Sequence, residues 1–242
     1  MYGIFVALIS GVAVAAALKF GLGLATLYIA FTGVIAAAIV YIIIFRIITK
    51  KVTAGMDIVQ RDMQGNRSEK AVKSLESLLR YAPWQIYLKG QINSQIGAIH
   101  YLKRDFKLAF DYLSKSFSKH WAGMGMLAIC YMRKNKTKDM IQTFDKAVMI
   151  NKKEPVIWEV YAFCLDRIGE HQKAIEILEK GLKKVGGSET MEANLEALKA
   201  GKKQKMMPYG DLWYQFHLEK QGAIIKKQTK AMTGRKKTIV RR

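Results

Sequence analysis

Two long apolar runs open the chain, and segments that mix apolar and polar residues follow them. Residues 3–18 and 22–48 are apolar at nearly every position, and only Lys19 and Arg46 carry a charge before residue 49. At about 1.5 Å per residue, a helix of about 20 residues crosses a hydrocarbon layer of about 30 Å. Because a helix that is apolar on all sides needs a membrane or a buried bundle around it, we predict a two-helix transmembrane hairpin over residues 1–48, with its turn at residues 19–21.

The charges that flank these runs predict an orientation. Arg46, Lys50 and Lys51 follow the second run, whereas Lys19 stands alone in the turn. Basic residues collect on the cytoplasmic side of a membrane, so we expect an integral protein of the inner or plasma membrane, if bacterial, with residues after 49 in the cytoplasm. A cleaved signal peptide is the alternative for the first run, although no basic residue precedes it. Small residues recur four apart, which either lets the helices approach closely or only fills the membrane: Ala7, Gly11, Ala15, Gly33 and Ala37.

Beyond residue 52 the apolar positions recur at helical spacing, and one stretch repeats another. Residues 156–184 (VIWEVYAFCLDRIGEHQKAIEILEKGLKK) place similar residue types in the same order as residues 122–150 (AGMGMLAICYMRKNKTKDMIQTFDKAVMI), 34 positions earlier. Cys130 and Cys164 obey the same offset. We therefore assign the two cysteines to equivalent packing positions on successive helices.

This order and the 34-residue period resemble the tetratricopeptide repeat (TPR) family. Weaker copies at residues 52–86 and 90–120 precede the clear ones at 121–154 and 155–187. The resemblance covers residues 52–187 and implies an all-α fold, in which four stacked helix pairs form a solenoid. The first helices of the pairs would then line a concave surface, the default place for a protein partner.

Residues 188–232 continue at helical spacing and predict capping and C-terminal helices. Ser188 is a candidate N-cap for the first, and another helix is expected to open at Pro208. Residues 233–242 are basic and without periodicity, which predicts a disordered tail. The aromatic residues of the second helix favour docking on the solenoid over contact with a partner or a bilayer: Trp213, Tyr214 and Phe216.

Catalytic and metal-binding patterns are absent from the sequence. The four histidines stand apart from one another and from the two cysteines, unlike the ligands of a zinc site. The glycines form no phosphate-binding loop, and pairs of acidic residues lie among lysines, as on solvated helix faces. We predict that the chain is not an enzyme and has no catalytic residue, cofactor or metal.

The net charge of +21 concentrates at the C-terminal end. Residues 199–242 hold 13 basic and 2 acidic residues, so an anionic lipid surface is a natural contact. Nucleic acid ranks behind protein and lipid as a partner, because aromatic and basic residues do not alternate on a recognisable binding module. The candidate lipid or polyanion contacts are Arg235, Lys236, Lys237, Arg241 and Arg242.

The predicted concave surface presents an apolar strip with two arginines 34 residues apart. Such a strip suits an apolar segment that carries an acidic residue, although the arginines can equally pair with local carboxylates such as Asp166 or Glu170. We predict a membrane-anchored adaptor that holds a protein partner. The alternatives are a structural subunit of an oligomeric envelope assembly and a membrane-tethered nucleic-acid or ribosome contact. The six candidate groove residues are Met126, Ile129, Arg133, Val160, Phe163 and Arg167.

Overall fold

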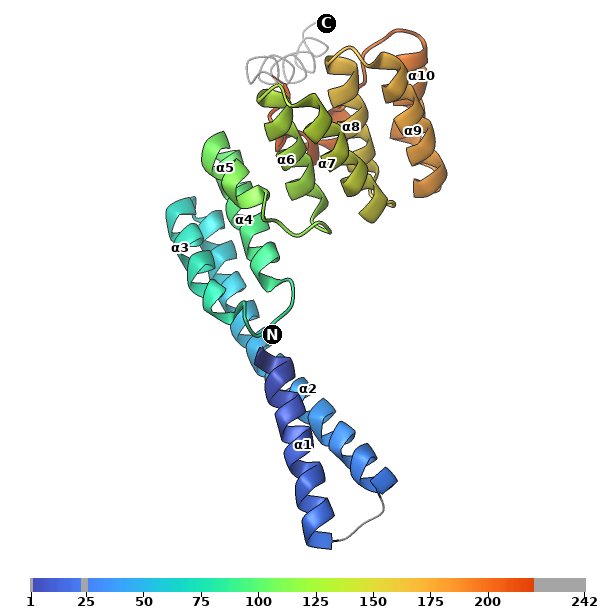
Figure 1. Ribbon diagram of the computed structural model, residues 1–242. Helices are drawn as coiled ribbons and strands as arrows, with labels where there is room; N and C mark the ends of the chain where they lie inside the picture. The colour runs from blue at the N-terminus through green and yellow to red at the C-terminus, as the bar shows by residue number, and fades with distance from the viewer. Residues whose placement is uncertain (1, 23–25, 220–242) are drawn as a thin grey trace, which may run out of the picture. The chain divides into compact units, whose positions relative to one another are not determined.

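All regular elements are helical in the part of the chain that the structure describes, residues 2–22 and 26–219 of a computed structural model (Figure 1). The fold is all-α, as the sequence predicts, and consists of an apolar helical hairpin and stacked helix pairs of the TPR type. The chain divides into two compact units. Unit 1 comprises residues 1–100 and 107–120, and unit 2 comprises residues 101–106 and 121–242.

The apolar hairpin of unit 1 consists of α1 (Tyr2–Leu22) and the first half of α2 (Thr26–Gln64). Gly11 and Gly33 lie at the contact between the two helices, where a Cβ on Gly11 would stand 2.6 Å from the Gly33 carbonyl oxygen. This close approach agrees with the packing interpretation of the small residues. The turn lies later than predicted, because α1 continues through Lys19 and ends at Leu22.

The second apolar run and the first helix of the first pair are one continuous helix. The change in composition near residue 49 is therefore no break in the backbone, since α2 runs for 39 residues without interruption. No proline occurs there to end the helix. The C-terminal half of α2 packs against α3 (Ser68–Leu78) and α4 (Leu88–Leu102) around a buried core that includes Val52, Leu75 and Ile92.

The rest of unit 1 completes a second helix pair. The short helix η1 (Leu79–Tyr81) follows α3, and α5 (Phe106–Leu113) packs against α4. Gly97 on α4 permits this contact, because a Cβ there would lie 2.7 Å from the Leu113 side chain.

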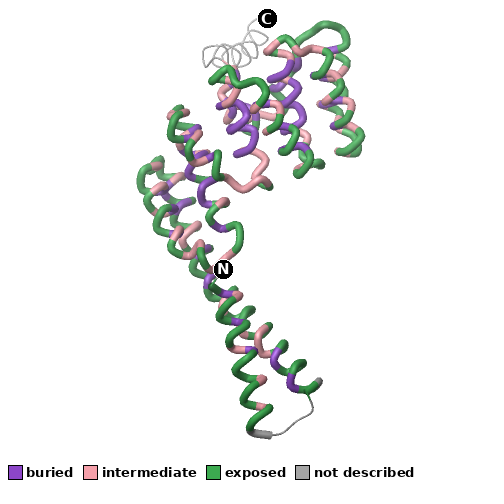
Figure 2. The backbone as a smooth tube through the Cα atoms, in the orientation of Figure 1, coloured by how far each residue is buried: buried purple, intermediate pink, exposed green. Residues whose placement is uncertain are grey.

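Unit 2 stacks two helix pairs and a capping helix. The pairs are α6 (Trp121–Arg133) with α7 (Thr137–Ile150), and α8 (Pro155–Arg167) with α9 (His171–Val185). Both helices of the first pair contact α8, and α10 (Glu189–Lys199) covers α9. The first helices supply much of the buried core, drawn in purple in Figure 2.

Equivalent residues of the two pairs occupy equivalent places. Cys130 and Cys164 are both free thiols and both buried, which confirms their assignment to packing. The turns inside the pairs need a left-handed backbone at Asn135 (φ 58°) and Gly169 (φ 89°), again 34 residues apart. Glycine and asparagine adopt this conformation most readily.

The chain after α9 begins as predicted and then departs from the prediction. Ser188 caps α10, with its Oγ accepting from the Met191 amide at 3.5 Å. The helix expected from Pro208 is much shorter, because only η2 (Met207–Tyr209) and the four-residue α11 (Asp211–Tyr214) form before residue 219. Left-handed backbone at Gly210 and His217 bounds α11 on both sides. Residues 220–232 of that expected helix lie outside the described part.

Candidate functional site

The surface formed by α6 and α8 in unit 2 is the candidate site, and the chain covers it with its own C-terminal segment. We define the groove as the side of α6 and α8 that carries the six predicted residues, and the C-terminal segment as residues 204–218. Trp213 and Phe216 of this segment are 1% and 0% exposed. The structure therefore confirms that these two aromatic residues dock on the repeats, and it corrects the expectation of an open groove.

Aromatic contacts seat the segment. The Trp213 ring meets the Phe163 ring edge to face, with centroids 4.7 Å apart. Phe216 lies against Gly125 on α6, where an added Cβ would stand 2.9 Å from the ring. Position 125 thus admits Phe216 only because it has no side chain.

Two side chains hold the backbone of the segment. The Tyr101 hydroxyl donates to the carbonyl oxygen of Phe216 at 2.7 Å, and Nη1 of Arg167 donates to that of Leu218 at 2.8 Å. The His217 ring also stacks on the ring of Tyr101. These donors read backbone carbonyls, which every peptide carries, so they do not depend on the side chains of the segment.

A buried carboxylate connects the segment to α8 and α10. Glu159 is 0% exposed, and its oxygens accept hydrogen bonds from Asn194 Nδ2 at 3.0 Å and Gln204 Nε2 at 2.7 Å. The Tyr209 hydroxyl donates a longer bond of 3.4 Å. Burial raises the pKa of Glu159 to about 7, and the three donors limit this rise. The network joins three elements that are far apart in sequence.

The sequence interpretation did not single out Glu159 or Gly125, although both lie at the centre of the site. A signal for Glu159 exists, because it is the one charged residue in the run PVIWEVYAFCL at residues 155–165. Glu159 and Gly125 are also 34 residues apart, on equivalent turns of α8 and α6. Both positions contact the C-terminal segment, one by hydrogen bonds and one by the absence of a side chain.

The six predicted residues lie together but differ in exposure. Met126, Ile129 and Val160 are at most 1% exposed, and Phe163 is half-buried. Arg133 and Arg167 are exposed and line one surface pocket of about 350 Å³, which His217 and Leu218 also border. The pocket places two guanidinium groups at the end of the apolar strip.

The alternative partners suggested for these arginines are engaged elsewhere. The carboxylate of Asp166 pairs with His171 at 2.7 Å, and that of Glu170 pairs with Lys173 at 3.0 Å. Arg133 instead lies over the Phe106 ring, 3.8 Å from its centroid, in a cation–π contact. The local ion pairs considered from sequence are therefore not the ones that form.

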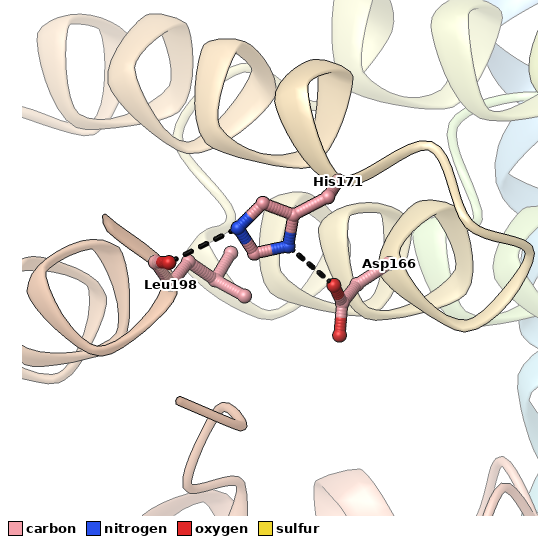
Figure 3. A network of polar contacts seen from close by, with 3 residues as sticks. All are labelled: Asp166, His171 and Leu198. Carbon is pink, nitrogen blue, oxygen red and sulfur yellow. Dashed lines mark hydrogen bonds and ion pairs between the residues drawn. The ribbon is translucent and has the colours of Figure 1, made fainter. Parts of the chain in front are cut away.

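His171 has a structural role at the corner between α8 and α9. Its Nδ1 lies 2.7 Å from an Asp166 oxygen and its Nε2 lies 3.1 Å from the carbonyl oxygen of Leu198 on α10 (Figure 3). Both partners are acceptors, so only the doubly protonated ring satisfies both. The hydrogen bond to Asp166 accordingly raises the pKa of His171.

Within residues 2–22 and 26–219, no three histidine, cysteine or acidic side chains gather as metal ligands. The two thiols are unsuited to nucleophilic chemistry, because burial raises the pKa of Cys130 to about 11 and raises that of Cys164 as well. The five predicted basic contacts of the tail, residues 235–242, lie outside the described part of the chain.

Comparison with known proteins yields no sequence relative and a distant structural likeness. No protein-family model and no curated protein matches the chain. Among solved structures, MamA from Desulfovibrio magneticus RS-1 (residues 41 to the end) aligns with a TM-score of 0.48 and 14% identity, over 62% of this chain and 85% of that one. A second MamA crystal structure aligns with a TM-score of 0.48 and 16% identity, over 72% and 97%. A likeness at this level says nothing about function, and the fold assignment rests on the helix pairs themselves.

Proposed function

We propose that the protein is a membrane-anchored scaffold that holds a protein partner through the groove of unit 2. The exposure of the apolar hairpin carries the first half of this proposal. Large apolar side chains on both helices are about two-thirds exposed, for example Ile9, Val12, Phe31 and Val34 (Figure 2). Each gains about 1.5–3 kcal/mol when it leaves water, so the hairpin calls for an apolar surrounding that the rest of the chain does not supply.

A membrane anchor fits these helices better than a soluble core helix or a cleaved signal peptide does. A core helix of a soluble protein is mostly buried, whereas only 17% and 11% of the most apolar windows of α1 and α2 are buried. A cleaved signal peptide needs no fixed place in the mature fold. Here α1 packs along α2 at Gly11 and Gly33, and its first residues contact the loop after α3.

The hairpin geometry supports a topology with both ends on one side. The amide of Tyr2 donates to the carbonyl oxygen of Pro83 at 2.9 Å, so the start of α1 lies beside the first helix pair. The basic residues that follow the second span then favour the cytoplasm for this side. A cysteine placed at Lys19 should react with an impermeant thiol reagent added outside sealed cells, and one at Lys70 should not.

The occupied groove supports the second half of the proposal. A partner segment would replace the C-terminal segment, place two large apolar side chains where Trp213 and Phe216 lie, and offer its carbonyls to Tyr101 and Arg167. An acidic group on that partner would fit the pocket between Arg133 and Arg167. Adaptor function follows from such a surface because its strongest contacts are to features that many peptides share.

Alkaline carbonate extraction of membranes tests the anchor. The full chain should stay in the pellet, and a variant with Val12→Arg and Val34→Arg should move to the supernatant. A wild-type chain that extracts fully would refute membrane insertion.

Photo-crosslinking in native membranes tests the groove. A photoreactive residue at Arg133, on its rim, should give a protein adduct, and the same residue at the exposed Lys146 on α7 should not. Opening the groove with Trp213→Ala and Phe216→Ala should increase the adduct at 133. Equal adducts at both positions, unchanged by the opening variant, would refute the groove as the partner surface.

A further inference from the structure

The loop that joins α3 to α4 in unit 1 has an unusual composition for an exposed connection. Residues 79–87 read LRYAPWQIY, with three aromatic residues and an arginine. Ile86 is 47% exposed and Tyr87 is 65% exposed, although the next residue, Leu88, is 2% exposed. The loop thus leaves two large apolar side chains in solvent immediately before the core begins.

Three contacts tie this loop to the level at which the apolar helices end. The Tyr2 amide donates to the carbonyl oxygen of Pro83 at 2.9 Å, and the Tyr2 ring meets the Trp84 ring edge to face at 5.8 Å. Gln85 Nε2 donates to Thr49 Oγ1 at 2.7 Å. Tyr2 begins α1, and Thr49 directly follows the second apolar run. The loop therefore lies beside both chain positions at which a spanning hairpin would leave the hydrocarbon.

The charges around the loop have one sign. The Arg80 guanidinium lies 5.3 Å from the centre of the Tyr81 ring, and Lys51 Nζ lies 6.0 Å from it. Lys50 is also exposed. Residues 79–90 contain no aspartate or glutamate. The loop and the neighbouring turn of α2 together form an aromatic and basic surface.

We propose that residues 79–87 are a third membrane contact, lying in the headgroup region of the bilayer. This inference rests on the proposed membrane anchor. Tryptophan and tyrosine favour the membrane interface because their rings are apolar and their polar atoms stay hydrated. Ile86 and Tyr87 enter the boundary of the acyl chains, while Arg80 and Lys51 face lipid phosphates.

Such a contact has a mechanical consequence. A single helix that leaves a membrane can tilt and rotate. Here α2 continues without a break into the first helix pair, and the loop adds a second point of attachment beside it. Two attachments fix how unit 1 is oriented on the bilayer surface.

Spin labels on the full chain in vesicles of phosphatidylcholine and phosphatidylglycerol test the inference. Single cysteines replace Ile86, Tyr87, Val12 in the hairpin, and Lys70 at the far end of α3. All four positions are exposed, and the native thiols are at most 2% exposed, so each variant takes one label. The label's collision rates with oxygen, which dissolves in lipid, and with a water-soluble nickel chelate report its depth.

The expected result is a graded loss of contact with the nickel chelate. The label at 70 should collide with it freely, the labels at 86 and 87 should lose most of these collisions, and the label at 12 should lose nearly all. Labels at 86 and 87 that behave like the one at 70, with the label at 12 protected, would overturn the loop contact and leave the anchor standing. A label at 12 open to the chelate would overturn both.

Discussion

The buried carboxyl group of Glu159 predicts that unit 2 becomes less stable as the pH rises. Burial raises its pKa from 4.5 to about 7. Below pH 4.5 the group is protonated in both the folded and the unfolded chain. Between pH 4.5 and about 7 the unfolded chain releases the proton and the folded chain keeps it, which favours unfolding. The contribution of Glu159 to the free energy of unfolding is therefore greatest in acid and is lost as the pH rises through this window.

The size of the effect follows from the difference between the two pKa values. One pKa unit corresponds to about 1.4 kcal/mol, so the rise to about 7 makes the ionised group cost about 3 kcal/mol above that pH. Glu159→Gln keeps the shape and removes the titration. Asn194 can still donate to the new amide oxygen. Gln204 can accept from the new amide nitrogen after its own amide turns over, because its Oε1 is buried without a partner.

Urea unfolding followed by tryptophan fluorescence measures this difference. We expect Glu159→Gln to gain up to about 3 kcal/mol relative to the wild type between pH 4.5 and pH values above 7. Histidines contribute equally to both proteins and cancel in the difference. Glu176→Gln, at an exposed position on α9, is the matched control and should show no such trend. A difference between Glu159→Gln and the wild type that does not change with pH would refute the titration of Glu159.

Three further substitutions test other contacts. Gly125→Ala should lower the free energy of unfolding by about 1–3 kcal/mol through overpacking against Phe216, although alanine favours a helix by about 1 kcal/mol; a thermal melt that shows stabilisation would mean that Phe216 is not seated there. His171→Gln should destabilise unit 2 most below pH 6.5 and least in alkali, because the raised pKa gives the charged ring its contribution in acid; urea titrations with the reverse trend would contradict the double hydrogen bond. Gly11→Leu should lower the melting temperature of the hairpin in detergent, since its backbone touches Gly33, whereas Val12→Leu at an exposed position should not; equal melts by circular dichroism would contradict the close approach.

Local patterns in the sequence determine the elements of this protein. The apolar runs predict two long helices because hydropathy over about 20 residues needs no tertiary context. The 34-residue offset predicts paired helices and the burial of Cys130 and Cys164, because each repeat presents the same face to the same kind of neighbour. Ser188 is recognisable as an N-cap from the residues that directly follow it.

Only the tertiary structure decides what covers the groove. The bond from Tyr101 to Phe216 spans 115 positions and the bond from Gln204 to Glu159 spans 45, so no periodic pattern connects the two ends. The aromatic residues of the C-terminal segment predicted docking but not its place, which depends on the missing side chain at Gly125 and on the buried carboxyl group. Likewise, charge composition marked a boundary near residue 49, yet α2 crosses it, because helix continuity depends on backbone geometry and not on the solvent that each half meets.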